Sequence, residues 1–207
     1  MKLNLKSDWS DLTIKDYVSI QGMTPEDNPL DILAILTDKT REELEALPLK
    51  AIQQLIIETD FIFNDEPNTA SAADALNDWT YTDSARWKPE MDISNLTAGQ
   101  LIDIMELGKD KDTITENLHV ILSILLNKQE RKWLKWRDVV NREIMKDAEH
   151  LFNTFPADRA LSIVGFFLPI LESLSSNTLA SLRKKHKKQM KKELNKAIPS
   201  NNNSVGS

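Results

Sequence analysis

Three histidines are the residues best suited to acid–base or metal chemistry, and their positions favour neither. His119, His150 and His186 lie far apart in the 207-residue chain, and none is followed within three to five residues by a second ligand in metal-binding form. Asp147 and Glu149 beside His150 are more typical of a satisfied histidine on a helix surface than of a general base. We therefore expect no catalytic and no metal-binding histidine.

Other catalytic devices are missing as well. The chain has no cysteine, so the sequence offers no thiolate nucleophile, disulfide or cysteine-based zinc site. The five glycines are too scattered for a phosphate-binding loop, and serine-nucleophile motifs are absent. Asp110 and Asp112 resemble a calcium loop only faintly, because no glycine and bidentate glutamate complete it. The sequence predicts a protein that is not an enzyme and needs no cofactor.

Tryptophan side chains could instead contribute to the binding of a partner protein. Apolar residues recur at helical spacing over residues 128–153, so this stretch predicts one long amphipathic helix. Exposed aromatic patches commonly mark interfaces, although packing on the protein's own core is the more conservative interpretation. The predicted partner-binding residues are Trp133, Trp136, Val140 and Ile144.

Basic residues are concentrated in one segment. Eight of the 26 basic residues but one of the 32 acidic residues fall within 183–196, which leaves 18 basic and 31 acidic residues elsewhere, a balance of −13. Such a segment is expected to contact nucleic-acid phosphates or an acidic protein surface, or only to keep the chain soluble. The candidate contact residues are Arg183, Lys184, Lys185, Lys187, Lys188, Lys191 and Lys192.

The elements that would carry these residues follow the same order twice. Thr13 with Asp16, and Thr97 with Gln100, have the spacing of a capping box at the start of an apolar helix. The repeated order predicts an internal duplication.

Two further helices complete each copy. A second apolar helix is expected over residues 30–36, after Asn28-Pro29, and over 118–126. A third helix is introduced by proline, by Pro48 in the first copy and by Pro156 in the second.

The stretch between the two copies differs in composition. Residues 67–95 predict a linker that contains a small β-hairpin, in which Trp79, Tyr81 and Trp87 pair across the strands. The predicted fold is therefore all-α, with two related short helical subdomains and a long basic C-terminal helix. The expected boundaries are 1–66, 67–95, 96–182 with an inserted amphipathic helix at 128–153, and 183–207. Subdomains of this size are expected to pack together or to form homo-oligomers.

The apolar pattern resembles that of a known group of proteins. The segments SNLTAGQLID at 94–103, ENLHVIL at 116–122 and ALSIVGFFL at 160–168, with DNPL at 27–30 and LPL at 47–49, are similar to small helical tail assembly chaperones and virion morphogenesis proteins of tailed bacteriophages that infect Bacteroidetes-type hosts. The resemblance implies a helical protein of the host cytoplasm or the virion that binds phage tail or other virion proteins. It supplies no catalytic residues.

The leading functional prediction is thus a non-enzymatic, protein-binding factor in phage particle assembly. Tail assembly chaperone and minor structural virion protein remain two open forms of it. The alternative is a nucleic-acid-binding accessory protein that acts through the basic C-terminal helix. No apolar run reaches the roughly 18–20 residues of a membrane span, so no membrane partner is expected.

Overall fold

A computed structural model describes residues 5–64, 72–83, 85–132, 135–139, 142–171 and 173. Contacts divide the chain into two units, residues 1–168 and 169–207. The described residues belong to the first unit, apart from residues 169–171 and 173 at the end of the last helix. The predicted basic C-terminal helix lies outside the described residues.

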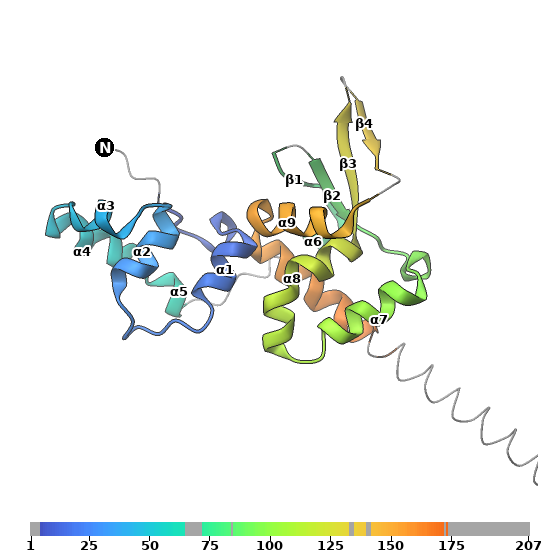
Figure 1. Cartoon of the computed structure of the whole chain (residues 1–207), viewed down its shortest axis with the longest axis horizontal. Helices are drawn as coiled ribbons and strands as arrows, with labels where there is room; N and C mark the ends of the chain where they lie inside the picture. The colour runs from blue at the N-terminus through green and yellow to red at the C-terminus, as the bar shows by residue number, and fades with distance from the viewer. Residues whose placement is uncertain are drawn as a thin grey trace, which may run out of the picture. The chain divides into compact units, whose positions relative to one another are not determined.

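Short helices form the first part of this unit. They are the 3-10 helix η1 (Trp9–Asp11) and the α-helices α1 (Ile14–Ile20), α2 (Pro29–Thr37), α3 (Arg41–Glu45), α4 (Leu49–Glu58) and α5 (Phe61–Asn64) (Figure 1). The capping box of Thr13 and Asp16 is present, and Asn28 caps α2 ahead of Pro29, as the sequence predicts. A third capping box, at Thr40, starts α3.

A small apolar core joins three of these helices. The buried side chains of Leu33, Leu44 and Leu55 come from α2, α3 and α4, and Leu30 and Ile52 pack against them. α4 therefore turns one side inward and leaves the opposite side without a neighbour in this core.

The helices of the second part range from one short 3-10 turn to α-helices of 10 to 15 residues. They are α6 (Ala72–Asn77), the 3-10 helix η2 (Ile93–Asn95), α7 (Ala98–Leu107), α8 (Lys111–Leu125), α9 (Ile144–Thr154) and a final helix over residues 157–171. The capping box of Thr97 and Gln100 starts α7 as predicted. α8 begins seven residues before the predicted 118, because Asp110 caps it through the backbone N–H of Thr113.

The two parts are joined directly. α1 packs against both α8 and α9. The backbone N–H of Ile14 donates to the carbonyl oxygen of Phe155 at 3.1 Å, and that of Ala157 donates to the carbonyl oxygen of Leu12 at 2.8 Å. The duplication of the two halves itself stays a prediction.

A four-stranded antiparallel sheet corrects the all-α prediction. Its strands are β1 (Thr80–Tyr81), β2 (Ala85–Pro89), β3 (Leu126–Lys132) and β4 (Lys135–Asp138), in that spatial order. The hairpin of β1 and β2 stands where the sequence predicts one, but it is one edge of this larger sheet. Trp87 faces Thr80 and Tyr81 faces Arg86, so the expected aromatic pairs across the hairpin are wrong.

The predicted helix over residues 128–153 is also wrong. Its first part contains β3 and β4, and among its described residues the helix is confined to α9, which begins at Ile144. Lys, Arg, Glu and Gln favour helices when they are considered alone. Here β3 instead pairs with β2, which is remote in sequence, over residues 126–130, and its Lys128 forms an ion pair with the buried Asp147 of α9.

Candidate binding surfaces

The predicted partner-binding face does not exist as one helical surface. Trp136 lies in β4 and Ile144 is the first residue of α9, whereas Trp133 and Val140 lie outside the described residues. A role of these side chains in partner binding stays a prediction. The basic residues of 183–192 also lie outside the described part of the chain.

The sheet instead gathers aromatic and basic side chains on one of its faces. Successive residues of a strand point to opposite faces, and the register aligns Tyr81, Arg86, Gln129 and Asp138 in one row across all four strands. We call this surface the outer sheet face. Its members are Trp79, Tyr81, Arg86, Lys88, Asn127, Gln129, Arg131, Trp136 and Asp138.

Arg86 is the centre of the outer sheet face. Its guanidinium carbon lies 4.4 Å from the ring centroid of Trp79 and 4.8 Å from that of Trp136, so both rings make cation–π contacts with it. Its Nε and Nη2 donate to Oε1 of Gln129 at 2.8 and 2.6 Å. Gln129 in turn donates to Asp138 at 2.7 Å, so the row is held in a fixed arrangement.

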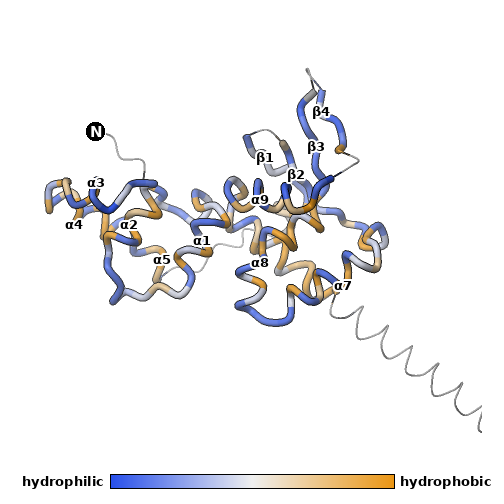
Figure 2. Tube along the Cα trace, in the orientation of Figure 1, coloured by the Kyte–Doolittle hydropathy of each residue, from blue (hydrophilic) through white to orange (hydrophobic). Residues whose placement is uncertain are grey.

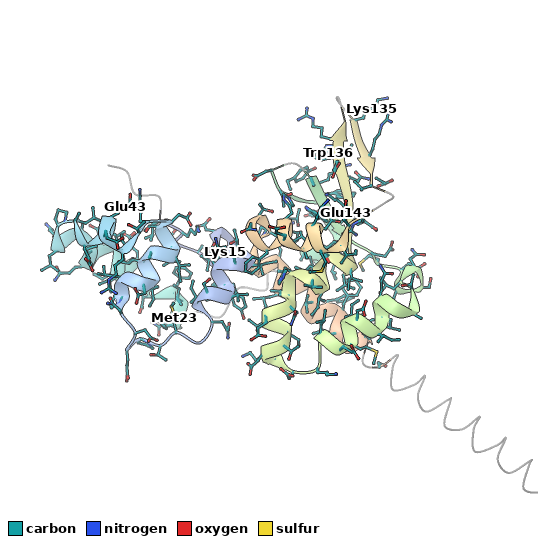
Figure 3. All side chains as sticks on the ribbon, in the orientation of Figure 1. Lys15, Met23, Glu43, Lys135, Trp136 and Glu143 are labelled. Atoms are coloured by element: carbon teal, nitrogen blue, oxygen red, sulfur yellow. The ribbon has the colours of Figure 1, made fainter. Side chains whose placement is uncertain are left out.

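The remaining residues of this face are exposed or half-buried. Tyr81 is 61% exposed, and its ring meets that of Trp136 edge to face at 5.9 Å. A cavity of about 340 Å³ beside Trp79 is lined by Lys88, Asn127, Gln129 and Asp138, among others. Figure 3 shows Trp136 and Lys135 on the hairpin of β3 and β4, which extends away from the helices.

The opposite, inner face of the sheet is a buried polar network. The carboxylate of Asp147, on α9, is almost fully buried and accepts from Nζ of Lys128 at 2.9 Å and from Nε of Arg142 at 2.8 Å. Arg142 also donates to the carbonyl oxygens of Ser123 and Leu126, where α8 ends and β3 begins. Burial opposes the charge on Lys128, but hydrogen bonds to Glu130 and Asp147 outweigh it and raise the pKa of the lysine.

Trp87 is fully buried at the centre of this network. Lys128 and Arg142 lie 5.4 and 5.5 Å from its ring centroid, and the ring of His150 stacks on it at 6.0 Å. The indole N–H donates to Oγ1 of Thr82 at 3.1 Å, and Nε2 of His150 lies 2.9 Å from the same oxygen. These contacts fasten the sheet to α9 and assign His150 a structural position.

Both described histidines are half-buried, and the pKa of each is lowered. Burial, together with the charge of Lys128, lowers the pKa of His150, and burial lowers the pKa of His119. Nδ1 of His119 is buried without a hydrogen bond to a described residue, and its ring lies 4.9 Å from that of Phe152. Lowered pKa values keep both rings neutral near pH 7.

A second candidate surface is the apolar outer side of α4. Leu49 is 72% exposed and Ile57 is 74% exposed, and the neighbouring Ile56 is partly exposed. Leu49 and Ile56 are two helical turns apart, so they share a side, and Ile57 borders it. Apolar stretches on α4 are visible along the tube in Figure 2. We call Leu49, Ile56 and Ile57 the α4 apolar face.

Two kinds of site are not found among the described residues. No group of three or more histidines and carboxylates is placed to hold a metal ion. No described helix is long and apolar enough to cross a membrane.

Comparison with known proteins adds no relative. No family model, curated protein or solved structure matches the chain.

Sequence reasoning missed the outer sheet face because its residues come from three separate segments. Arg86 and Gln129 are 43 positions apart, and no local pattern links them. One signal was available in the sequence: Arg86 and Lys88 alternate with the apolar Ala85, Trp87 and Pro89, as in a strand with one open face.

Proposed function

We propose that the protein acts by binding other proteins, without catalysis, as a factor in bacteriophage particle assembly. The observation that supports this best is the α4 apolar face. Isolated exposed apolar residues are ordinary, but Leu49, Ile56 and Ile57 lie together on one short helix.

The proposed binding mode needs no chemistry beyond burial of apolar surface. Ile52 and Leu55 anchor the inner side of α4 in the core with Leu33 and Leu44, so the outer side is presented on a fixed support. A partner that lays an apolar groove or helix over Leu49 and Ile57 removes both side chains from water. Each such burial stabilises a complex by about 1.5–3 kcal/mol before the entropic cost of association.

The assembly role itself rests on the resemblance to phage tail assembly chaperones and morphogenesis proteins. A chaperone of this kind covers the exposed apolar segments of tail components reversibly, and a minor virion component keeps the contact permanently. Both forms place the protein in the host cytoplasm, and the second also in the particle. Mass spectrometry of purified particles distinguishes them.

Co-purification with tail proteins tests this proposal. The full chain is produced together with each tail protein of the same phage, including the tape-measure-like protein, as wild type and as the double variant Leu49→Ser/Ile57→Ser. We expect capture of at least one tail protein by the wild type and at least about tenfold weaker capture by the variant, since two buried apolar contacts are lost.

A matched control removes exposed apolar residues elsewhere. Ile102→Ser/Met145→Ser changes side chains that are 56% and 69% exposed on α7 and α9, and we expect it to keep wild-type capture. Equal loss in both double variants, or no capture of any virion protein by the wild type, would rule the proposal out.

A further inference from the structure

The outer sheet face is rich in basic residues, although most of the chain is acidic. Outside residues 183–196 the chain has a balance of −13. The outer sheet face nevertheless carries Arg86, Lys88 and Arg131 against the carboxylate of Asp138, and one further carboxylate, that of Glu90, accepts from Asn127 at its edge. Exposed Lys135 and Arg137 on β4 add to the positive charge nearby. A local reversal of charge of this kind attracts a polyanion.

We propose that the outer sheet face binds single-stranded nucleic acid. In this arrangement Tyr81 and Trp79 stack on bases, and Lys88 and Arg131 contact the phosphates on either side of the row centred on Arg86. This function goes beyond the protein-binding role of α4 and does not depend on it.

Aromatic rings distinguish a nucleic acid from an acidic peptide as the partner. An acidic peptide satisfies the cations but offers no flat groups to the three rings, whereas every base has a face that stacks on an aromatic side chain. Tyr81 is the most exposed of the three, and its edge-to-face contact with Trp136 leaves ring surface open. In a duplex the base faces are stacked on one another, so the fit is to a single strand.

Arg86 preorganises the platform. Its guanidinium contacts both Trp79 and Trp136, which fixes the two rings before any ligand arrives. Nη1 makes no hydrogen bond to a described residue, in contrast to Nε and Nη2, which are held by Gln129. Nη1 therefore has donors to offer a phosphate.

Polar groups beside the rings suit the edge of a base. The cavity of about 340 Å³ next to Trp79 brings the amides of Asn127 and Gln129 and the carboxylate of Asp138 to one place. Gln129 is engaged by Arg86 and Asp138, and Nδ2 of Asn127 donates to Glu90, so the oxygens of Asn127 and Asp138 are the groups that keep acceptor capacity for a base edge. Five of the eight residues that line the cavity belong to the outer sheet face, and the others are Pro89, Lys128 and Val139.

Binding of a fluorescently labelled 12-nucleotide oligothymidylate to the full chain tests the proposal. Fluorescence polarisation gives the affinity over a range of salt concentrations, and tryptophan quenching reports stacking at the sheet. We expect binding that weakens steeply with salt, quenched tryptophan emission, and weaker binding of a duplex of the same length.

Two sets of variants locate the site. Tyr81→Ala should weaken binding about fivefold or more, whereas Tyr81→Phe should keep it, because a base stacks on either ring.

Lys88→Gln/Arg131→Gln should lower the salt slope by roughly 1.4, since each lost phosphate contact contributes about 0.7 for a single strand. Lys15→Gln/Lys50→Gln makes the same charge change on exposed lysines of α1 and α4 and should leave the slope unchanged.

The basic segment 183–196 must be separated from the sheet. A variant with Lys184, Lys185, Lys187 and Lys188 changed to Gln keeps the outer sheet face, so tryptophan quenching and the effect of Tyr81→Ala should persist in it. Binding that disappears in this variant and ignores the sheet variants would overturn the proposal. So would the absence of binding at 50 mM salt, or equal binding of an oligoglutamate peptide that Tyr81→Ala leaves unchanged.

Discussion

At the scale of single residues, Asp147 decides how the sheet is attached. Its buried carboxylate receives Lys128 from β3 and Arg142 from the segment before α9, so one side chain joins two elements that are apart in sequence. A buried ion pair is weak support for stability in itself, but the removal of one partner leaves the others charged and unpaired. Loss of the charge on Asp147 is therefore expected to destabilise the fold.

We predict that Asp147→Asn lowers the free energy of unfolding by about 3–5 kcal/mol, as expected when one partner of a buried ion pair is removed. Urea denaturation followed by circular dichroism measures the change. Glu130→Gln is the matched control, because Glu130 also pairs with Lys128 at 2.9 Å but is 41% exposed, and its loss should cost less than about 1 kcal/mol. Similar costs for both variants would show that the burial of Asp147 has no energetic consequence.

At the scale of elements, helix starts are fixed by local spacing. Thr13, Thr40 and Thr97 each form a capping box with the residue three positions later. The hydroxyl of each threonine accepts a hydrogen bond from the backbone N–H three residues later. The side chain of that later residue in turn accepts from the backbone N–H of the threonine. Such a start needs no tertiary contact.

We predict that Thr97→Ala destabilises the protein by about 1 kcal/mol, whereas Thr97→Ser costs much less, because serine keeps the hydroxyl that accepts from Gln100. Thermal denaturation of the three proteins measures the difference. If Ser and Ala are equally destabilising, the contribution comes from the methyl group of the threonine and not from the cap.

At the scale of the whole molecule, the two described histidines connect stability to pH. Burial lowers the pKa of His119 and of His150 below 6.5 in the folded protein. The unfolded chain then binds more protons than the folded chain as the pH falls below 6.5, so this contribution to stability is present above pH 6.5 and is lost on acidification. Carboxylates with a lowered pKa, such as Glu90 and Asp92, titrate below about 4.5 and act at lower pH.

We predict that the free energy of unfolding falls between pH 7 and pH 5, and that the fall is smaller in His119→Gln/His150→Gln. Glutamine does not titrate, and at position 150 it still reaches Thr82 with an amide. Urea denaturation at several pH values measures both curves. Parallel curves for the two proteins would show that other groups cause the pH dependence.

The sequence by itself determined the features that depend on a few neighbouring residues. The caps at Thr13 and Thr97, the Asn28-Pro29 start of α2 and the hairpin of β1 and β2 all follow from side chains within a few positions of one another. It also predicted the apolar helices around them.

Only the tertiary structure shows that residues 126–132 and 135–138 form strands. Their composition suits a helix, and a helix satisfies its backbone hydrogen bonds within its own segment, so no local signal argues against one. In strand β3, residues 126–130 pair through their backbone with β2, about 40 positions earlier, and place Lys128 against Asp147 of α9. The free energy gained from these remote partners exceeds the local preference, and that is the physical reason the outer sheet face cannot be seen before the chain is folded.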